Sequence, residues 1–442
     1  MTRARKDGLF FIVLGSLILV LFGVALSVSS PASMVDFKLN YYPARCLIQH
    51  CDPYKEADVM RVFRAEQNAH PVESARQNLY LTGYPYWPTI FFLTVPLAVL
   101  PFQIASLIWM AATGGGLILA SFLMWNIGAE SAPVITGALI GFLLANSELC
   151  LVVGNVAGIV VSLCVVAAWC FIKHQFVAWG VVCLAVSLAI KPHDTGLIWL
   201  YFLLAGGVYR RRALQTFAVT VALSLPGVLW VTYISPHWLR ELQFNMQELM
   251  AHGATGDPGP ASSGGHALEM MINLQTAISV FRDEPRFYNP VSYVLCGVIF
   301  LILCLASRRV APSPSRAWLA IASLAALTML PVYHREADAK LLLLTIPALA
   351  ILWARGGLTG RLALAITTAG FVLTSEIPWA IVLGIISHLH LPDAEWSREI
   401  VICVQVFPIP LILLVVSIFY LWAYARPDGG HIASETFQGQ RR

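Results

Sequence analysis

Residues 9–29, LFFIVLGSLILVLFGVALSVS, form an almost unbroken apolar run that is long enough to cross a bilayer as a helix. The rest of the chain has the same character, since 58% of its 442 residues are hydrophobic and 12% are charged; an average soluble protein has about 25% charged residues. The run exceeds the roughly 7–15 apolar residues of a signal peptide, so we expect it to be retained, although the small residues near Ser33 leave cleavage open. The sequence therefore predicts an all-α integral membrane protein.

Apolar segments recur along the whole chain and alternate with short polar breaks, as a multi-spanning bundle requires. We predict about twelve transmembrane helices, and several are short enough to be tilted or re-entrant. The predicted spans are residues 9–29, 101–125, 131–147, 150–171, 176–190, 194–208, 213–234, 291–307, 317–333, 340–354, 362–379 and 399–423. They form one polytopic domain, residues 1–442, with two long connections at 30–100 and 235–290.

The two long connections carry different patterns. In the first, apolar residues recur at helical spacing between Glu56 and Gln77, which predicts a helix along the membrane surface. The aromatic stretch 84–88 follows, and the apolar stretch 89–100 behind it is either a re-entrant piece or the early part of a Pro-broken second span. In the second, glycine and polar residues crowd positions 253–265, which predicts a mobile segment that orders when substrate binds.

Arginine clusters set the predicted orientation. If the N-terminus is cytoplasmic, the basic segments 210–212, 308–316 and 355–361 all fall in cytoplasmic connections, in agreement with the positive-inside rule. An even number of spans places both termini on that side and both long loops outside. We therefore predict a multi-pass protein of the inner or plasma membrane with an extracytoplasmic site. The net charge of +4 is small and scattered, so nucleic acid is not an expected partner.

Polar residues converge on the predicted outer side. Asp36 follows the first span, and the other polar segments are Gly154-Asn155, Lys191-Pro192-His193-Asp194, Ser235 to Trp238 and Tyr333 to Lys340. Ionisable groups at or near membrane depth are costly and are therefore functional candidates.

Each of these groups also has a purely structural interpretation. Lys191 can pair with Asp194 in a tight turn, and Asp338 can pair with Arg335 on a helix. Asn155 can hydrogen-bond a neighbouring helix. Lys38 and Lys340 are expected to be snorkelling anchors at span ends.

One chemistry fits the whole set. An acid such as Asp36 can deprotonate a sugar or lipid hydroxyl, and Lys191, His334 and Arg335 can bind a phosphate leaving group. The candidate substrate-binding residues are Tyr41, Tyr42, Tyr84, Tyr86, Trp87, Asn155, His193 and Asp338, in which the aromatic rings would stack on sugar faces. The chain has neither a P-loop nor a Gly-rich dinucleotide turn, so the expected donor is carried by a lipid, not by a nucleotide.

Two of the nine cysteines, Cys46 and Cys51, lie in the first outer loop. On an oxidising face they could form a disulfide that closes a tight loop. With His50 between them a metal site is conceivable, but two thiols and one imidazole are a thin ligand set. We predict no metal ligands, and whether the reaction needs a divalent ion stays open.

Several short motifs occur in the order seen in one known family. They are Asp36-Phe37 with Tyr41-Tyr42, Asp52-Pro53-Tyr54, Tyr84 to Pro88 with Val95-Pro96-Leu97, Gly154-Asn155 and Lys191-Pro192. In this set the chain resembles the polytopic GT-C glycosyltransferases, in particular family 87, which contains polyprenyl-phosphate-mannose-dependent α-mannosyltransferases. The segment from His334 to Asp338 is similar to a later family element. The family commonly has Gly-Gln where this chain has Gly154-Asn155.

The resemblance implies that Asp36 is the catalytic base and that Lys191 and His334 contact the donor phosphate. It further implies inversion at the anomeric carbon and no nucleotide cofactor. The expected donor is a polyprenyl-phosphate sugar, with mannose as the expected sugar. The expected partners are membrane lipids and a lipid or glycan acceptor. Two alternatives stay open. A transporter of lipid-linked sugars should have repeated halves and midplane charges, and a polysaccharide ligase or polymerase should have an arginine-rich outer site.

Overall fold

The structure is a computed structural model that describes residues 1–29, 33–69, 83–259, 271–309, 313–388, 404 and 406–426. The regular elements in these ranges are all helices, and the one extended pairing among them is an isolated bridge between Met271 and Arg335. The helices are α1 (Arg3–Ser29), α2 (Val35–Ile48), α3 (Glu56–Ala69), η1 (Pro88–Ile90), α5 (Phe91–Ala98), α6 (Phe102–Gly128), α7 (Pro133–Ala145), α8 (Glu148–Val152), α9 (Ala157–Lys173), α10 (Val177–Ile190), α11 (Pro192–Leu204), α12 (Gly207–Ile234), α13 (Trp238–Leu249), α14 (Leu274–Ser279), α15 (Pro285–Ser307), α16 (Pro314–Leu327), η2 (Glu336–Leu344), α17 (Thr345–Arg355), α18 (Gly357–Leu373), α19 (Glu376–His388) and α21 (Pro408–Ala425).

Seven helical stretches in the described part of the chain are long and apolar enough to cross a membrane. They are α1, α6, α7 with α8, α12, α15, η2 with α17, and α21. The pair α18–α19, bent by 67°, forms an eighth candidate span. The predicted all-α membrane architecture is therefore confirmed. Each of the twelve predicted spans overlaps a helix, but the count of twelve is not confirmed because helices such as α9 and α10 are shorter than a span.

The first span packs closely on α7 through glycine. A Cβ atom added at Gly15 would collide with the backbone of Gly141, and one added at Gly137 would collide with the backbone of Gly8. Without side chains at these positions the two backbones approach directly, which is how membrane helices gain packing energy in the absence of a hydrophobic driving force. The contact fixes the direction from which α1 delivers the chain to α2.

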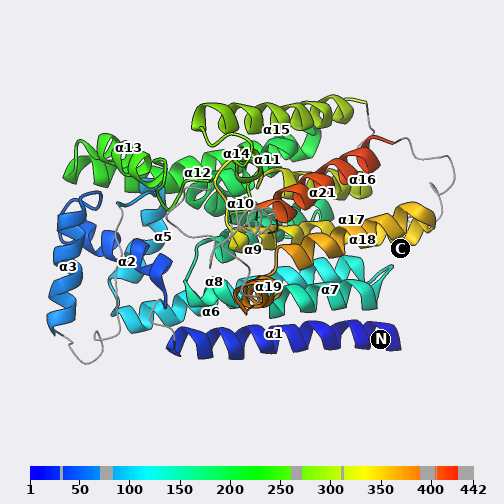
Figure 1. The fold of residues 1–442 in the computed structure, drawn as a ribbon, viewed down its shortest axis with the longest axis horizontal. Helices are drawn as coiled ribbons and strands as arrows, with labels where there is room; N and C mark the ends of the chain where they lie inside the picture. The colour runs from blue at the N-terminus through cyan, green and yellow to red at the C-terminus, as the bar shows by residue number, and fades with distance from the viewer. Residues whose placement is uncertain are drawn as a thin grey trace.

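The bundle has two distinct ends. Helices α2, α3, α5 and α13, which belong to the two long connections, gather at one end (Figure 1). The start of α1, the α17–α18 connection and the end of α21 lie at the opposite end (Figure 1). The two long connections, although separated by 134 residues of sequence (101–234), thus cover the same end of the bundle.

The structure refines several expected boundaries. The surface helix predicted from Glu56 is α3, which ends at Ala69; residues 70–77 of that prediction, 260–265 of the mobile segment and 399–403 of the last span lie outside the described residues. The apolar stretch 89–100 forms a short separate helix, α5, which packs on α2.

The predicted span 362–379 is wrong as a single helix. It is broken after Leu373, because Glu376 begins a new helix and turns its carboxylate to the backbone N–H of Leu149 at 2.9 Å. The snorkelling role expected for Lys340 is also wrong. Lys340 is 2% exposed, and its ammonium lies 3.2 Å from Glu376 and donates to the carbonyl of Asn146 at 2.6 Å.

Candidate active site

Asp36 lies in the first turn of α2, where the backbone is tied to the end of α8. Its backbone N–H donates to the carbonyl of Val153 at 2.8 Å, and its carboxylate accepts a hydrogen bond from the side-chain amide of Asn155 at 2.5 Å. The side-chain amide of Asn40 donates to the Asp36 carbonyl one turn later at 2.9 Å. Asp36 is therefore fixed from three directions, as a group that must meet a substrate hydroxyl in one orientation requires.

The turn that presents Asn155 depends on Gly154. This glycine has φ +68°, a left-handed conformation that residues with a side chain rarely adopt, and an added Cβ would lie 2.8 Å from Phe37. The Gly154 carbonyl accepts a hydrogen bond from the indole of Trp109 at 2.9 Å. Asn155 in turn accepts from the backbone of Ala157 at 2.8 Å, so its amide N–H₂ is directed to Asp36.

Burial raises the pKa of the Asp36 carboxyl. The hydrogen bond from Asn155 and the positive charges of Arg335 and Lys191 oppose this rise only in part. A carboxylate with a raised pKa is a stronger base than an ordinary aspartate, which suits it to accept a proton from a hydroxyl group.

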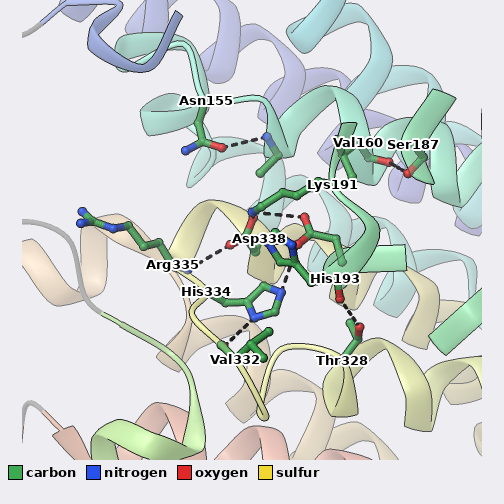
Figure 2. A network of polar contacts seen from close by, with 12 residues as sticks. Asn155, Val160, Ser187, Lys191, His193, Thr328, Val332, His334, Arg335 and Asp338 are labelled. Carbon is green, nitrogen blue, oxygen red and sulfur yellow. Dashed lines mark hydrogen bonds and ion pairs between the residues drawn. The ribbon is translucent and has the colours of Figure 1, made fainter. Parts of the chain in front are cut away.

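Lys191 is the centre of a second set of charges. It is the N-cap residue of α11, its ammonium pairs with Asp338 of η2, and it lies 3.3 Å from the carboxylate of Asp194 (Figure 2). The local Lys191–Asp194 pair expected from the sequence is thus present, together with a second, long-range partner. Because Asp338 also accepts from the backbone N–H of Arg335 at 3.0 Å, it joins α11 to the start of η2.

His334 lies behind this ion pair. Its Nδ1 contacts the carbonyl of Val332 at 2.9 Å and its Nε2 contacts Asp194 at 3.0 Å (Figure 2). A carbonyl oxygen only accepts hydrogen bonds, so Nδ1 of His334 carries a proton. The contact between Nε2 and the Asp194 carboxylate is a hydrogen bond only if one of these two groups also carries a proton. His334 is also 0% exposed and both of its ring nitrogens contact protein atoms, so its predicted contact with a donor phosphate stays a prediction.

Arg335 differs from these buried groups. It is half-buried, and its side chain extends away from the Lys191–Asp338 contact (Figure 2). Its guanidinium lies 5.4 Å from the ring of Tyr333 and donates to the Tyr333 hydroxyl, and its charge reaches Asp36. A half-buried planar guanidinium whose charge reaches Asp36 is suited to bidentate binding of a phosphate.

The predicted aromatic residues fall into two groups. Tyr86 is half-buried and close enough to Asp36 and Lys191 for both charges to act on its hydroxyl. Trp87 is 54% exposed and packs on Trp238, with ring centroids 5.9 Å apart.

Tyr41, Tyr42 and Tyr84 are buried in an aromatic cluster with Phe37 and Phe102. Tyr41 donates to the carbonyl of Leu100 at 2.8 Å. These three rings pack against protein, and a sugar contact for them stays a prediction.

The remaining predicted residues lie at the margins of the site. The side chain of His193 is 41% exposed, and its Nε2 is 3.5 Å from Asp194. Cys46 and Cys51 are joined by a disulfide that closes the turn after α2. Sequence reasoning did not select Asn40 or Tyr333 as site residues; the only available signal for Tyr333 was its position beside His334.

Two groups of described residues bring possible metal ligands within 4.8 Å of one another: His193, Asp194 and His334 in the site, and His252, Asp257 and Asp283 in the second long connection. In the first group the ammonium of Lys191, 3.3 Å from Asp194, already supplies a positive charge that would repel a divalent ion. The prediction of no metal ligands stays a prediction.

The apolar spans define a polytopic membrane protein. The acids, cations and imidazole between them are the groups that acid–base and phosphate chemistry require. A family model described as glycosyltransferase family 87 matches residues 84–333, which is more than half of the chain. The chain therefore belongs to glycosyltransferase family 87 and is a glycosyltransferase, as its resemblance implied. No curated protein and no solved structure matched it. The matched segment contains Asn155 and Lys191, whereas Asp36 precedes it and His334 directly follows it.

Proposed function

We propose that the protein transfers a sugar from a polyprenyl-phosphate donor to a hydroxyl group of a lipid-linked or envelope glycan, with Asp36 as general base. The observation that carries the proposal is the placement of Asp36. It is a half-buried carboxylate, oriented by Asn155, within electrostatic reach of Lys191 and Arg335. A base and a phosphate-binding cation set at one site are what direct displacement of a phosphate by a hydroxyl requires.

In the proposed reaction the acceptor hydroxyl gives its proton to Asp36 while its oxygen attacks the anomeric carbon. The bond between that carbon and the donor phosphate oxygen breaks, and the phosphate leaves with the electron pair. Attack from the face opposite the phosphate inverts the anomeric configuration, as expected of a GT-C enzyme. Arg335 and Lys191 stabilise the charge that the phosphate gains.

The lipid-carried donor is supported by the environment of the site. Apolar spans surround it, and the chain has no P-loop or Gly-rich dinucleotide turn for a nucleotide sugar. The arginine-rich connections favour a cytoplasmic location for the opposite end of the bundle, which would make the site extracytoplasmic. Mannose is proposed as the sugar because the motif set resembles that of the mannosyltransferases in this family.

The test is incubation of the purified protein with a panel of polyprenyl-phosphate sugars and lipid acceptors, with products identified by mass spectrometry. Nucleotide sugars serve as control donors and an Asp36→Asn protein as control enzyme. We expect transfer from polyprenyl-phosphate mannose only, reduced about 10²–10⁴-fold with Asp36→Asn.

Two results would overturn the proposal. Transfer from a nucleotide sugar alone would exclude the lipid donor. Vectorial movement of a labelled lipid-linked sugar across proteoliposomes, with no transfer from any donor, would favour a transporter.

A further inference from the structure

Lys38 is a buried cation whose charge is not balanced by any acid among the described residues. It is 3% exposed, and the one contact of its ammonium among the described residues is with the ring of Phe102, whose centroid is 5.8 Å away. Asp36, two residues before Lys38, is engaged by Asn155, and Glu66 on α3 is engaged by Arg45. An unpaired buried ion costs several kcal/mol, so this position needs an explanation.

The surroundings of Lys38 add positive potential. Phe102 is the first residue of α6, a helix of 27 residues, and its N-cap residue Pro101 provides no side-chain cap. The N–H groups of the first turn have no acceptor within the helix, and the helix dipole places a partial positive charge there. Burial alone lowers the pKa of Lys38 to about 8, in agreement with an ammonium that has no counter-ion. Because the Lys38 ammonium lies over the ring of the first residue of this helix, two positive potentials act on the same region, and a bound anion would balance both.

The position of α6 indicates where that anion comes from. Three apolar residues in its first two turns are exposed on the surface of the protein, Ile104, Leu107 and Ile108, at 49%, 62% and 43%. These residues suit contact with lipid chains, and a helix of 27 residues is about 40 Å long, enough to cross the whole membrane. The first turn of α6 therefore lies at the level of lipid headgroups, where the abundant anion is phosphate.

We propose that Lys38 and the first turn of α6 bind the phosphate group of an anionic lipid. The site is separate from the donor centre, because Lys38 and Asp36 are two residues apart on α2 and so point to nearly opposite faces of that helix. The phosphate belongs either to a phospholipid of the bilayer or to a phosphate-bearing lipid substrate. The proposal does not depend on the donor specificity proposed above.

The test is lipid binding by native mass spectrometry of the detergent-solubilised protein. The probes are dioleoyl phosphatidylglycerol and, as the phosphate-free partner, dioleoylglycerol. The variants are Lys38→Met and Lys38→Arg, with Lys55→Met as matched control, since Lys55 belongs to the same connection but its side chain is 57% exposed. Lys38→Gln replaces Lys38→Met if the latter does not fold.

We expect Lys38→Met to weaken phosphatidylglycerol binding about tenfold, which corresponds to about 1.4 kcal/mol. Lys38→Arg and Lys55→Met should bind like the wild type. Competition by polyprenyl phosphate that is lost in Lys38→Met would assign the site to a lipid substrate, and its absence would assign the site to bilayer phospholipid. Equal binding by wild type and Lys38→Met, or of both probes by the wild type, would overturn the proposal.

Discussion

Two buried charge clusters lie on either side of η2, and they differ in what they can reach. The first contains Lys191, Asp338 and Asp194, with half-buried Arg335 and Asn155 beside Asp36. The second contains Lys340, Glu148 and Glu336, which are at most 6% exposed, and Glu376, whose side chain is 8% exposed. Because a 3₁₀ helix has three residues per turn, Asp338 and Lys340 point in different directions from the same short segment.

The difference teaches what separates a reactive centre from a structural one. Acids and bases of the same types form both clusters. In the first, charges of both signs are closely matched, and Arg335 and the neighbouring Asp36 are only half-buried. In the second, three acids share one lysine, and the Lys340–Glu376 pair joins η2 to α19, while Glu376 also holds the start of α8. We infer that the second cluster fixes the distance between the elements that carry Asp338 and Asn155.

The largest effect is expected for Asp36→Asn. The substitution keeps the shape of the side chain but removes the base, so transfer should fall about 10²–10⁴-fold while the fold is kept. Steady-state kinetics with the lipid donor measures the loss, and a melting temperature close to wild type serves as the control. A folded Asp36→Asn protein with full activity would remove Asp36 from the mechanism.

The second cluster should respond to Lys340→Met through stability. Removal of the ammonium leaves Glu376 buried without its partner, which should lower the free energy of unfolding by about 3–5 kcal/mol. The matched control is Lys340→Met combined with Glu376→Gln, since a glutamine can still accept from Leu149 and carries no charge. Thermal unfolding in detergent should show recovery in the double variant; a double variant as unstable as the single one would refute the pairing.

A smaller effect is expected in the pH dependence of activity, which reports on Asp36 beside the first cluster. Asp36 acts as a base only when ionised, and burial raises its pKa, so activity should be lost as pH falls through a value above the about 3.9 of an ordinary aspartate. The profile of kcat/KM against pH measures this limb. Asn155→Leu, which removes the hydrogen bond that opposes the rise, should move the limb to higher pH. A limb that persists in the residual activity of Asp36→Asn would assign it to another group.

The smallest effect is expected for Asn155→Gln, which restores the Gly-Gln pair common in family 87. The longer side chain keeps an amide that can reach Asp36, so kcat/KM should change only a few-fold, within about 1 kcal/mol. Asn155→Leu is the comparison, because it has a similar size and no donor. If Asn155→Gln were as damaging as Asn155→Leu, side-chain length would matter more than the hydrogen bond.

Much of the fold was predictable from local sequence. Hydropathy over about 20 residues identified the membrane class and a helix for each predicted span. The polar segments at predicted span ends contained Asp36, Asn155, Lys191, Asp194 and Asp338, which the structure brings together.

Other features had no local signal. The helix α2 was not expected from the sequence. Tyr41, Tyr42 and Tyr84, whose rings the sequence suggested for stacking on sugars, are buried in the structure. Lys340 and Glu376 are 36 residues apart in apolar segments, so the local sequence around either residue does not predict that they form an ion pair.

The sequence by itself determined that the chain crosses a membrane and which acids and cations lie near one end of its spans, because span length and polarity are properties of short segments. Only the tertiary structure decided which charge meets which. Lys191 meets Asp338 across 147 residues and Asp36 meets Asn155 across 119, through contacts that depend on the crossing of helices. The same packing buries His334 and Lys340 and leaves Arg335 half-buried. It thereby divides the charged residues into a candidate active site and a structural cluster.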